Sequence, residues 1–264
     1  MPEQDAAAAP VLFAMAARHV AVVTLNRPEK RNAVNAALAS ALEAIVRRTE
    51  ADPDIRSVVL TSSFAPVFCA GADLAAAAVG QGKGIETAAG GFAGFTYIER
   101  SKPWIAAVEG KALAGGCEIV LACDMLVASR TASFGLPEVQ RGMMAGAGGA
   151  HRIGKLLPRN IANELLATGD PLDAEFAYRW GMVNRLTQPG EAISTAVALA
   201  ERIAANAPVA VQFSLAAARE SAALPDATGR SVAGERFAAL KHTEDFKEGP
   251  RAFLEKRAPI WNGR

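Results

Sequence analysis

Two glutamates with apolar neighbours are the residues of this chain best suited to acid–base chemistry. Glu118 follows Gly115-Gly116-Cys117 at the predicted start of a helix, and Glu138 follows Pro137 in an apolar run. Burial disfavours the charged form of a carboxylate, which raises its pKa toward values useful for proton transfer near neutral pH. The two side chains are therefore candidates for an acid–base pair. Each could equally be a solvated residue of a first helical turn, where a carboxylate satisfies free N–H groups.

The glycines before Glu118 predict a second kind of chemistry. Gly115 and Gly116 at a helix start let backbone N–H groups approach a ligand closely, with the positive end of the helix dipole behind them. Ala72, which follows Gly71, offers another N–H group from a separate loop. Two such donors would form an oxyanion hole, in which loss of one donor costs about 10²–10³ in rate. The same glycines would also suit tight turns or close helix–strand contact.

Sequence motifs for other chemistries are absent. The chain contains neither G-x-S-x-G nor H-E-x-x-H, and its three histidines are isolated from one another. We interpret His151 as a surface residue. Cys117 and Cys123 lack the paired spacing of a zinc site, and residues 146–149 do not complete the G-x-G-x-x-G pattern of dinucleotide-binding folds. We therefore expect no metal site and no separate cofactor.

Composition excludes further classes of protein. The 264 residues are 51% hydrophobic, which is enough to bury a sizeable core. Because 28 basic side chains stand against 27 acidic ones, the net charge of +1 predicts no nucleic-acid or membrane partner. Three cysteines, an odd number, argue for free thiols in a reducing compartment. Residues 1–10 show no secretory signal and no run reaches about 18 apolar residues, so we expect a soluble, cytoplasmic protein.

The elements that must position the glutamates alternate between strand and helix, and the chain becomes almost wholly helical after residue 158. Strands are predicted at 20–25, 58–60, 104–108 and 125–128, helices at 35–50 and 117–122, and a loop at 64–74. Six further helices are predicted at 160–167, 173–180, 191–206, 209–221, 231–242 and 245–256. The Gly- and Ala-rich segment 80–94 contains little that would lock it to a core, and we expect a mobile pocket lid there.

In combination and order, these motifs resemble the crotonase (enoyl-CoA hydratase/isomerase) superfamily from about Val20 to Arg264. The motifs are LNRP at 25–28 with NA at 32–33, FCAGADL at 68–74, KPWIAAVEG at 102–110, AGGCE at 114–118, ACD at 122–124, FGLPE at 134–138 and GAGG at 146–149. The resemblance implies an α/β fold, the crotonase (ClpP-like) spiral of ββα units. It also implies a catalytic core over residues 1–200 and a helical region over residues 201–264 that forms trimers or dimers of trimers and caps CoA.

The resemblance also implies roles for individual residues. The oxyanion-hole donors would be the N–H groups of Ala72 and Gly115, the catalytic carboxylates Glu118 and Glu138, and the water site would lie beside Gly146. The implied substrate and CoA contacts are Arg31, Ala33, Ala70, Asp73, Leu74, Gly116, Pro137, Phe253 and Lys256. The last two residues sometimes serve a neighbouring subunit.

The implied reaction is hydration of a 2-trans-enoyl-CoA to a 3-hydroxyacyl-CoA, with the CoA thioester as substrate. Glu118 would orient and deprotonate water, and Glu138 would supply or relay a proton to C2, a contribution of about 10²–10⁴. Both glutamates are present, which favours hydration, because family members that only shift a double bond often keep an acid only at the Glu138 position.

Three alternatives stay open. The segments KLLP at 155–158, RWGMVN at 179–184, EGPRAFLEKR at 248–257 and WNGR at 261–264 look like the crotonobetainyl-CoA hydratase (carnitinyl-CoA dehydratase) branch. A second alternative is an enoyl-CoA isomerase. A third, from another class, is a non-catalytic acyl-CoA-binding or scaffold protein.

The sequence departs from the family pattern at two places. Ala145 stands where many relatives have proline, which predicts more movement in the water-site loop. Residues 75–78 lack the charged side chains often found after the Asp73 position, which leaves one set of CoA contacts without matching residues.

Overall fold

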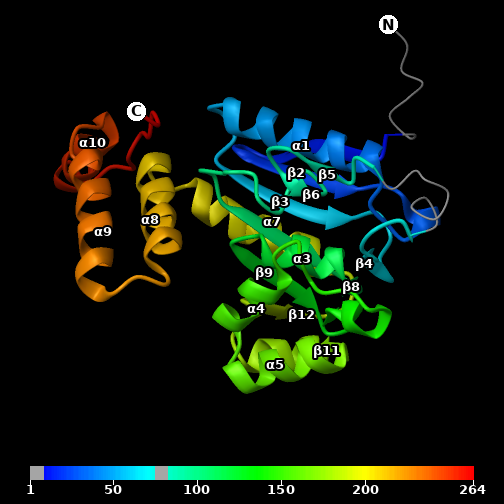
Figure 1. Cartoon of the computed structure of the whole chain (residues 1–264). Coiled ribbons are helices and arrows are strands. Elements are labelled where there is room, and N and C mark those ends of the chain that lie inside the picture. Colours follow the sequence, from blue (N-terminus) through cyan, green and yellow to red (C-terminus); the bar gives the residue numbers. More distant parts are fainter. Residues whose placement is uncertain (1–8, 75–82) are drawn as a thin grey trace, which may run out of the picture.

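The computed structural model describes residues 9–74 and 83–264. Sequence expectations for residues 1–8, 75–78 and 80–82 lie outside these ranges. Strands and helices alternate along the chain as far as α7, and helices alone follow (Figure 1). This arrangement confirms the predicted α/β class.

A six-stranded sheet in the order β1-β2-β3-β7-β9-β12 forms the centre of the molecule. Its strands are β1 (Val11–Ala17), β2 (Val20–Leu25), β3 (Ser57–Ser62), β7 (Trp104–Val108), β9 (Met125–Ser129) and β12 (Arg185–Thr187). β1 and β2 pair antiparallel, and all the other neighbours are parallel. The four predicted strands are confirmed as β2, β3, β7 and β9.

A second sheet of short strands positions the segments that carry the candidate site. Its order is β11-β10-β8-β4, with β4 (Val67–Cys69), β8 (Lys111–Leu113), β10 (Ser133–Gly135) and β11 (Leu172–Asp173). β4 follows β3, β8 follows β7 and β10 follows β9, so each turn of the chain adds one strand to each sheet. Because β4, β8 and β10 are parallel neighbours, the segments that leave their carboxyl ends lie side by side.

Residues of the large sheet alternate between two apolar layers. In β7, Trp104, Ala106 and Val108 face one cluster, while Ile105 and Ala107 face the other. Successive side chains of a strand point to opposite faces, so a wholly apolar strand predicts burial on both sides.

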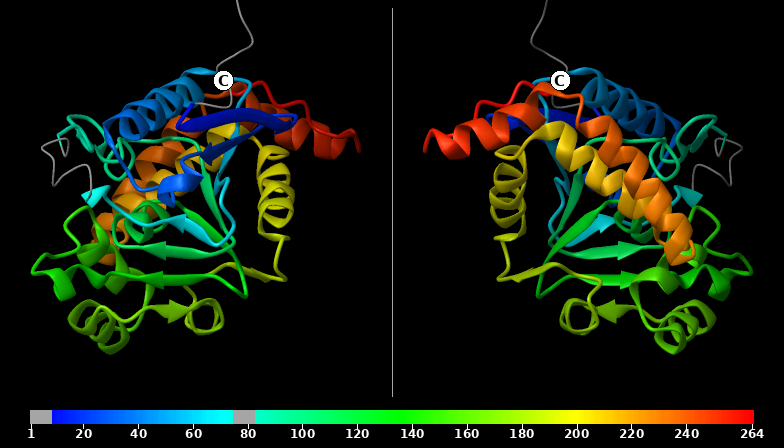
Figure 2. Two further views of the ribbon diagram at one scale, coloured as in Figure 1. Left: turned by 90° about the vertical axis from the view of Figure 1, so that its right-hand side faces the viewer. Right: turned by 90° about the vertical axis from the view of Figure 1, so that its left-hand side faces the viewer.

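Two helices cover these layers. α1 (Ala36–Ala51) buries Leu38, Leu42 and Val46 in the first cluster, and its N-cap Asn35 accepts a hydrogen bond from the Leu38 N–H at 3.0 Å. α7 (Ala192–Ala204) covers the second cluster with four buried alanines, each one turn from the next. These are Ala192, Ala196, Ala200 and Ala204. Figure 2 shows α1 in blue and α7 in yellow on different sides of the strands.

The remaining helices divide into two groups. Those within the core are η1 (Pro28–Lys30), α3 (Gly115–Leu121), η2 (Pro137–Arg141), α4 (Gly149–Leu156), α5 (Arg159–Thr168) and α6 (Ala174–Arg179). Those of the C-terminal region are α8 (Pro208–Ser221), α9 (Asp226–Leu240) and α10 (Glu244–Leu254), which stand to one side of the sheets in Figure 1. The predicted boundary at residue 201 falls inside α7, which packs on the sheet. We therefore propose that the division lies between α7 and α8.

A small hairpin lies within the segment 80–94, for which the sequence predicts mobility. β5 (Glu86–Thr87) and β6 (Gly91–Phe92) pair antiparallel, and Phe92 and Ala93 are buried in the first apolar cluster. The expectation that little would lock this segment to the core is therefore wrong for residues 83–94. Among the described residues, no helix is both long and apolar enough to cross a membrane.

Candidate active site

Glu118 is a buried carboxylate in the first turn of α3. Its side chain is inside the protein (3% exposed), and Oε1 accepts a hydrogen bond from the Gly149 N–H at 2.9 Å. Gly149 is the first residue of α4, so its N–H group has no acceptor within the helix. Burial raises the pKa of Glu118 to about 6, while the Gly149 hydrogen bond opposes the rise and the charge of Glu138 adds to it.

Glu138 is the second buried carboxylate, in the first turn of η2. It is 8% exposed, and burial raises its pKa as well. Among the described residues, its buried Oε2 has no hydrogen-bond partner. A buried acceptor without a donor is costly, and such atoms concentrate where a ligand or water completes the site.

The structure brings the two glutamates together. The charge of Glu138 raises the pKa of Glu118, and both charges raise the pKa of the buried thiol of Cys117, which directly precedes Glu118 in the chain. Parallel pairing of β8 and β10, with Leu113 opposite Gly135, explains this proximity, because α3 and η2 begin just after these strands.

The two proposed oxyanion-hole donors also lie on adjacent backbones. Gly71 has φ +90°, and a Cβ there would lie 2.9 Å from the Ala114 Cβ and 3.1 Å from the Gly115 nitrogen. Ala114 itself has the unusual φ 51° and ψ −130°, a conformation that costs alanine about 1–3 kcal/mol and is concentrated at functional sites. Within the described part of the chain, neither the Ala72 N–H nor the Gly115 N–H donates a hydrogen bond.

Gly115 and Gly116 are also needed for close packing. A Cβ on Gly115 would lie 2.4 Å from the Phe92 ring, and one on Gly116 would lie 2.1 Å from the Cys69 carbonyl oxygen. Gly115 therefore fits both interpretations of these glycines. It packs closely against a neighbouring side chain, and it presents an N–H group that could serve an oxyanion hole.

The segments expected to contact CoA meet beside the Ala72 loop. The Ala70 N–H donates to the Arg31 carbonyl at 3.1 Å, and the Asp73 N–H donates to the Val34 carbonyl at 2.9 Å. Arg31 and Leu74 are exposed, whereas Ala33, Ala70 and Asp73 are partly buried. The Asp73 carboxylate forms an ion pair with Arg27 at 3.2 Å, a functional contact that sequence reasoning missed. Nothing local indicates this pair, because its members are 46 residues apart.

Gly116 lies two residues before Glu118, Pro137 lies directly before Glu138, and Gly146 lies on the turn that precedes Gly149. Gly146 is exposed, and its carbonyl oxygen accepts a hydrogen bond from the Tyr97 hydroxyl at 3.2 Å. Tyr97 is a second residue that sequence reasoning missed. Its only signal is that it is the single tyrosine between Gly80 and Gly116.

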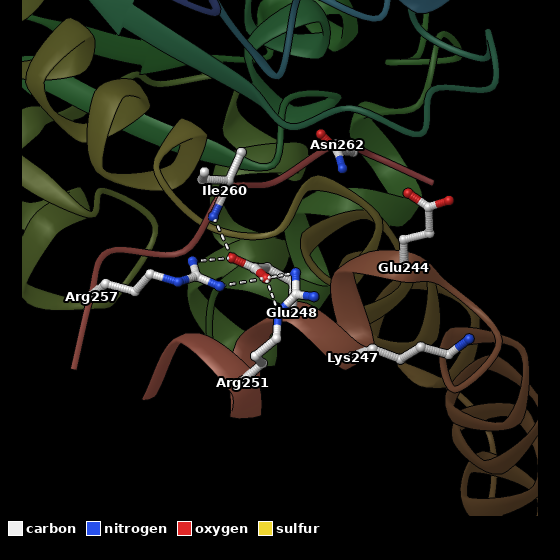
Figure 3. Close-up of a pocket in the computed structure, with 7 residues that line it drawn as sticks. All are labelled: Glu244, Lys247, Glu248, Arg251, Arg257, Ile260 and Asn262. Atoms are coloured by element: carbon white, nitrogen blue, oxygen red, sulfur yellow. Dashed lines mark hydrogen bonds and ion pairs between the residues drawn. The ribbon is translucent and has the colours of Figure 1, made fainter. Parts of the chain in front are cut away.

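Within a single copy of the protein, Phe253 and Lys256 lie apart from the other candidate site residues. Phe253 lies in the last turn of α10, which stands beyond α8 in Figure 1, and Lys256 follows two residues after the helix ends. Phe253 is 83% exposed. The end of the chain is tied to α10 through Glu248, which accepts hydrogen bonds from Arg257 and from the Ile260 N–H (Figure 3). The cavity drawn there is lined by Glu244, Lys247, Glu248, Arg251, Arg257, Ile260 and Asn262.

The polar groups of this site are carboxylates and backbone N–H groups. The described residues contain no group of three or more His, Cys, Asp or Glu side chains that could hold a metal ion. The site instead combines two buried carboxylates of raised pKa with two free backbone donors on neighbouring segments. Such a set can hold a developing oxyanion and move protons beside it.

Comparison with known proteins agrees with this geometry. Residues 16–264 match the model of a family described as enoyl-CoA hydratase/isomerase. The chain is 40% identical to a carnitinyl-CoA dehydratase of Salmonella typhi over 247 residues, 92% of this chain and 94% of the relative. An enoyl-CoA hydratase from Mycobacterium tuberculosis superposes with a TM-score of 0.92 at 41% identity, covering 97% of this chain and 100% of the other.

A carnitinyl-CoA hydratase structure from Mycobacterium avium gives a TM-score of 0.78 at 42% identity, with 97% of this chain and 99% of the other covered. The predicted spiral fold is thereby confirmed at high structural similarity. With a family model that spans nearly the whole chain and relatives at this identity, the chain belongs to the enoyl-CoA hydratase/isomerase family, the crotonases.

Proposed function

We propose that this protein hydrates a 2-trans-enoyl-CoA to the 3-hydroxyacyl-CoA. The observation that carries the proposal is the buried pair Glu118 and Glu138, both with raised pKa, beside the N–H groups of Ala72 and Gly115, which donate to no acceptor among the described residues. An isomerase needs to move one proton between two carbons, whereas hydration needs a base for water and an acid for C2. Two carboxylates serve the second requirement.

The proposed reaction begins with the thioester carbonyl between the Ala72 and Gly115 N–H groups. These donors stabilise negative charge on the carbonyl oxygen, which makes C3 electrophilic. Glu118 accepts a proton from water as the water oxygen bonds to C3, and the electrons of the double bond move into an enolate. Glu138 then supplies or relays a proton to C2, and the enolate electrons form the new C–H bond.

Binding of the substrate would use the surface around Arg31 and the Ala70–Leu74 loop. Arg31 is exposed and cationic, and it lies beside the loop that carries the Ala72 donor, so it could meet the phosphates of CoA. Asp73 would act mainly on loop position, because its carboxylate is paired with Arg27. Ala33, Ala70 and Leu74 would contact the nucleotide, and Gly116 and Pro137 the acyl end.

Assembly into a trimer or a dimer of trimers would complete this surface. α9 buries no residue within one chain, and Phe237 and Phe253 are 52% and 83% exposed. Such apolar exposure is typical of a surface covered by another copy. Phe253 and Lys256 would then reach the CoA bound to a neighbour, in a protein that works in the cytoplasm.

A second candidate substrate is crotonobetainyl-CoA. It is favoured by relatives named carnitinyl-CoA dehydratase at 40–41% identity over nearly the full chain. The same donors and glutamates would serve this reaction, since only the group on C4 differs.

The test uses the purified protein with crotonyl-CoA, crotonobetainyl-CoA and a 3-enoyl-CoA in water enriched in ¹⁸O, with products identified by mass. The proposal predicts ¹⁸O in a 3-hydroxyacyl-CoA from at least one 2-enoyl-CoA, and the more reactive substrate assigns the branch. Conversion of the 3-enoyl-CoA without uptake of ¹⁸O, and no other product, would identify an isomerase. Binding of CoA thioesters without any product would identify a non-catalytic binding protein.

A further inference from the structure

Arg152 is a partly buried arginine one turn into α4. Its guanidinium donates hydrogen bonds to two backbone carbonyl oxygens. Nη2 donates to the Thr96 carbonyl at 2.5 Å, and Nη1 donates to the Ala147 carbonyl at 3.3 Å. The guanidinium also lies directly against Gly148, where an added Cβ would come within 1.7 Å of Nη1. Arg152 therefore connects the turn at residues 146–149 to a segment more than fifty residues earlier in the chain.

Tyr97 strengthens the same connection. The Arg152 Cζ lies 5.1 Å from the centre of the Tyr97 ring, and the Tyr97 hydroxyl donates to the Gly146 carbonyl at 3.2 Å. The Tyr97 ring also stacks on the His151 ring, with the two ring centres 6.3 Å apart. The turn and the first residues of α4 are thus held against Thr96–Tyr97 by four contacts, two from Arg152, one from His151 and one from Gly146.

This turn ends in the donor that Glu118 uses. Gly149 follows Gly148 directly, and its N–H group donates to Glu118 Oε1 at 2.9 Å. The positive charge of Arg152 also favours the ionised form of Glu118. Arg152 does not itself hydrogen-bond to this carboxylate, and its side chain acts through the turn and through its field.

The segment that receives Arg152 also touches the proposed oxyanion hole. The Thr96 N–H donates to the Phe92 carbonyl at 3.2 Å, and the Phe92 ring packs on Gly115. The short stretch from Phe92 to Tyr97 therefore fixes both the Gly115 donor and the turn that carries Gly149.

We propose that Arg152 is a positioning residue of this site, which clamps the 146–149 turn to Thr96–Tyr97 and so holds the Gly149 N–H and a positive charge at Glu118. The inference deepens the proposed hydration and rests on it for its kinetic readout. Removing the clamp should misplace the carboxylate, and a misplacement of about 1 Å can cost 10²-fold in rate.

The charges that surround this contact set the expected direction of a pH effect. The Glu118 carboxylate favours the charged form of Arg152, and the Tyr97 hydroxyl and the Cys123 thiol also face it, the thiol with a pKa that burial raises to about 12. Arg152 in turn acts on Arg100 and His151 as a like charge. Glu118 is faced by Glu138, which disfavours its ionisation, and by Arg152, which favours it. Burial and the charge of Glu138 raise the pKa of Glu118, and the charge of Arg152 lowers it. Loss of the Arg152 charge should therefore move the pKa of Glu118 upward.

The test compares Arg152→Met and Arg152→Lys with Arg159→Met, which removes an exposed cation at the start of the next helix. The first readout is infrared titration of the Glu118 carboxylate, identified as the signal lost in Glu118→Gln, which needs no substrate. The second is kcat against pH with the 2-enoyl-CoA that reacts best.

Arg152→Met should titrate Glu118 at higher pH than wild type, shift the acid limb of kcat in the same direction and lower kcat about tenfold to a hundredfold. Arg152→Lys should keep the titration near wild type, because the charge remains, and still lower kcat, because the planar fork to Thr96 and Ala147 is lost. Arg159→Met should match wild type in both.

An unchanged Glu118 titration in Arg152→Met, or a wild-type kcat in Arg152→Lys, would overturn the proposal. If Arg152→Met does not fold, Arg152→Lys and Tyr97→Phe keep the test decisive, since Tyr97→Phe removes only the bond to Gly146 and should lower kcat with the titration unchanged. If wild type hydrates no enoyl-CoA, the proposed function fails, while the infrared titration still decides whether Arg152 acts on Glu118.

Discussion

The Gly149 N–H donates a hydrogen bond to Glu118 Oε1 at 2.9 Å, which places the first residue of α4 against a carboxylate on α3. The contact keeps one oxygen of a buried acid in a fixed direction. It also moderates the effect of burial, which alone would raise the pKa of Glu118 further. The same backbone group thus orients the proposed base and limits the rise of its pKa.

The first prediction concerns the pH dependence of stability. The pKa of Glu118 is raised from its ordinary value of 4.5 to about 6, chiefly by burial. Between these values the folded chain holds more protons than the unfolded chain, so the free energy of unfolding contributed by Glu118 falls as pH rises and is level above the folded pKa. The loss is about 2 kcal/mol, because one pKa unit corresponds to 1.36 kcal/mol.

Glu118→Gln should remove this loss, since an amide does not ionise and its oxygen can still accept from Gly149. Urea unfolding of both proteins below, within and above the window measures the difference. The variant should gain stability relative to wild type as pH rises. A constant difference across the window would show that burial does not raise this pKa.

The second prediction concerns Gly115 and Phe92. Gly115→Ala places a Cβ 2.4 Å from the Phe92 ring, so it should destabilise the protein by about 1–3 kcal/mol through overpacking. Phe92→Ala alone should cost about 3–5 kcal/mol because it leaves a cavity. The double variant should lose less free energy of unfolding than the two single variants lose together. The difference, which is the coupling energy, should be about 0.5–3 kcal/mol.

Gly154→Ala is the matched control for that cycle. Gly154 lies in α4 with nothing within 4 Å of an added Cβ, so alanine should stabilise the protein by about 0.4–1 kcal/mol. Thermal and urea unfolding of the set give the comparison. Strict additivity of Phe92→Ala and Gly115→Ala would mean that the ring and the glycine do not touch.

The third prediction concerns the end of the chain. Glu248 is 5% exposed and accepts from Arg257 Nη1 at 2.5 Å and from the Ile260 N–H at 2.9 Å. Glu248→Ala should release the segment around Ile260 from α10, which hydrogen exchange at the Ile260 amide would detect as loss of protection. Asn262 and Gly263, whose N–H groups donate to Asp245, should stay attached. Glu255→Ala is the control, because Glu255 pairs with the same Arg257 but holds no backbone N–H of this segment. Equal protection in the two variants would contradict the assignment.

Strands that are buried on both faces could be predicted from the sequence. Short strands that form only by pairing with strands from distant parts of the chain could not. β7 occupies residues 104–108 as predicted, since every residue is apolar and buried. β4, β8 and β10 have three residues each and form only because they pair with one another across distant parts of the chain. β1 was missed because its alanine-rich sequence has no strand periodicity, although it pairs with β2 along its length.

The same division holds for the candidate site. Glu118, Glu138 and the glycines stand out through their immediate neighbours, and the structure brings them together. Arg152, Tyr97 and Arg27 act through partners about 46 to 56 residues away, so no local pattern points to them. The hairpin at 86–92 was misjudged for a related reason. Its glycines suggest freedom, but Phe92 is fixed by Gly115, which lies far along the chain.

The most direct test of the account follows loss of the conjugated thioester absorbance of the reactive enoyl-CoA for wild type, Glu118→Gln and Glu138→Gln. If the two carboxylates form the acid–base pair, each variant should unfold cooperatively like wild type and lose about 10²–10⁴ in kcat. The double variant should lose much less than the product of the two losses, because the residues act as a unit. A folded single variant that hydrates at the wild-type rate would contradict the central claim.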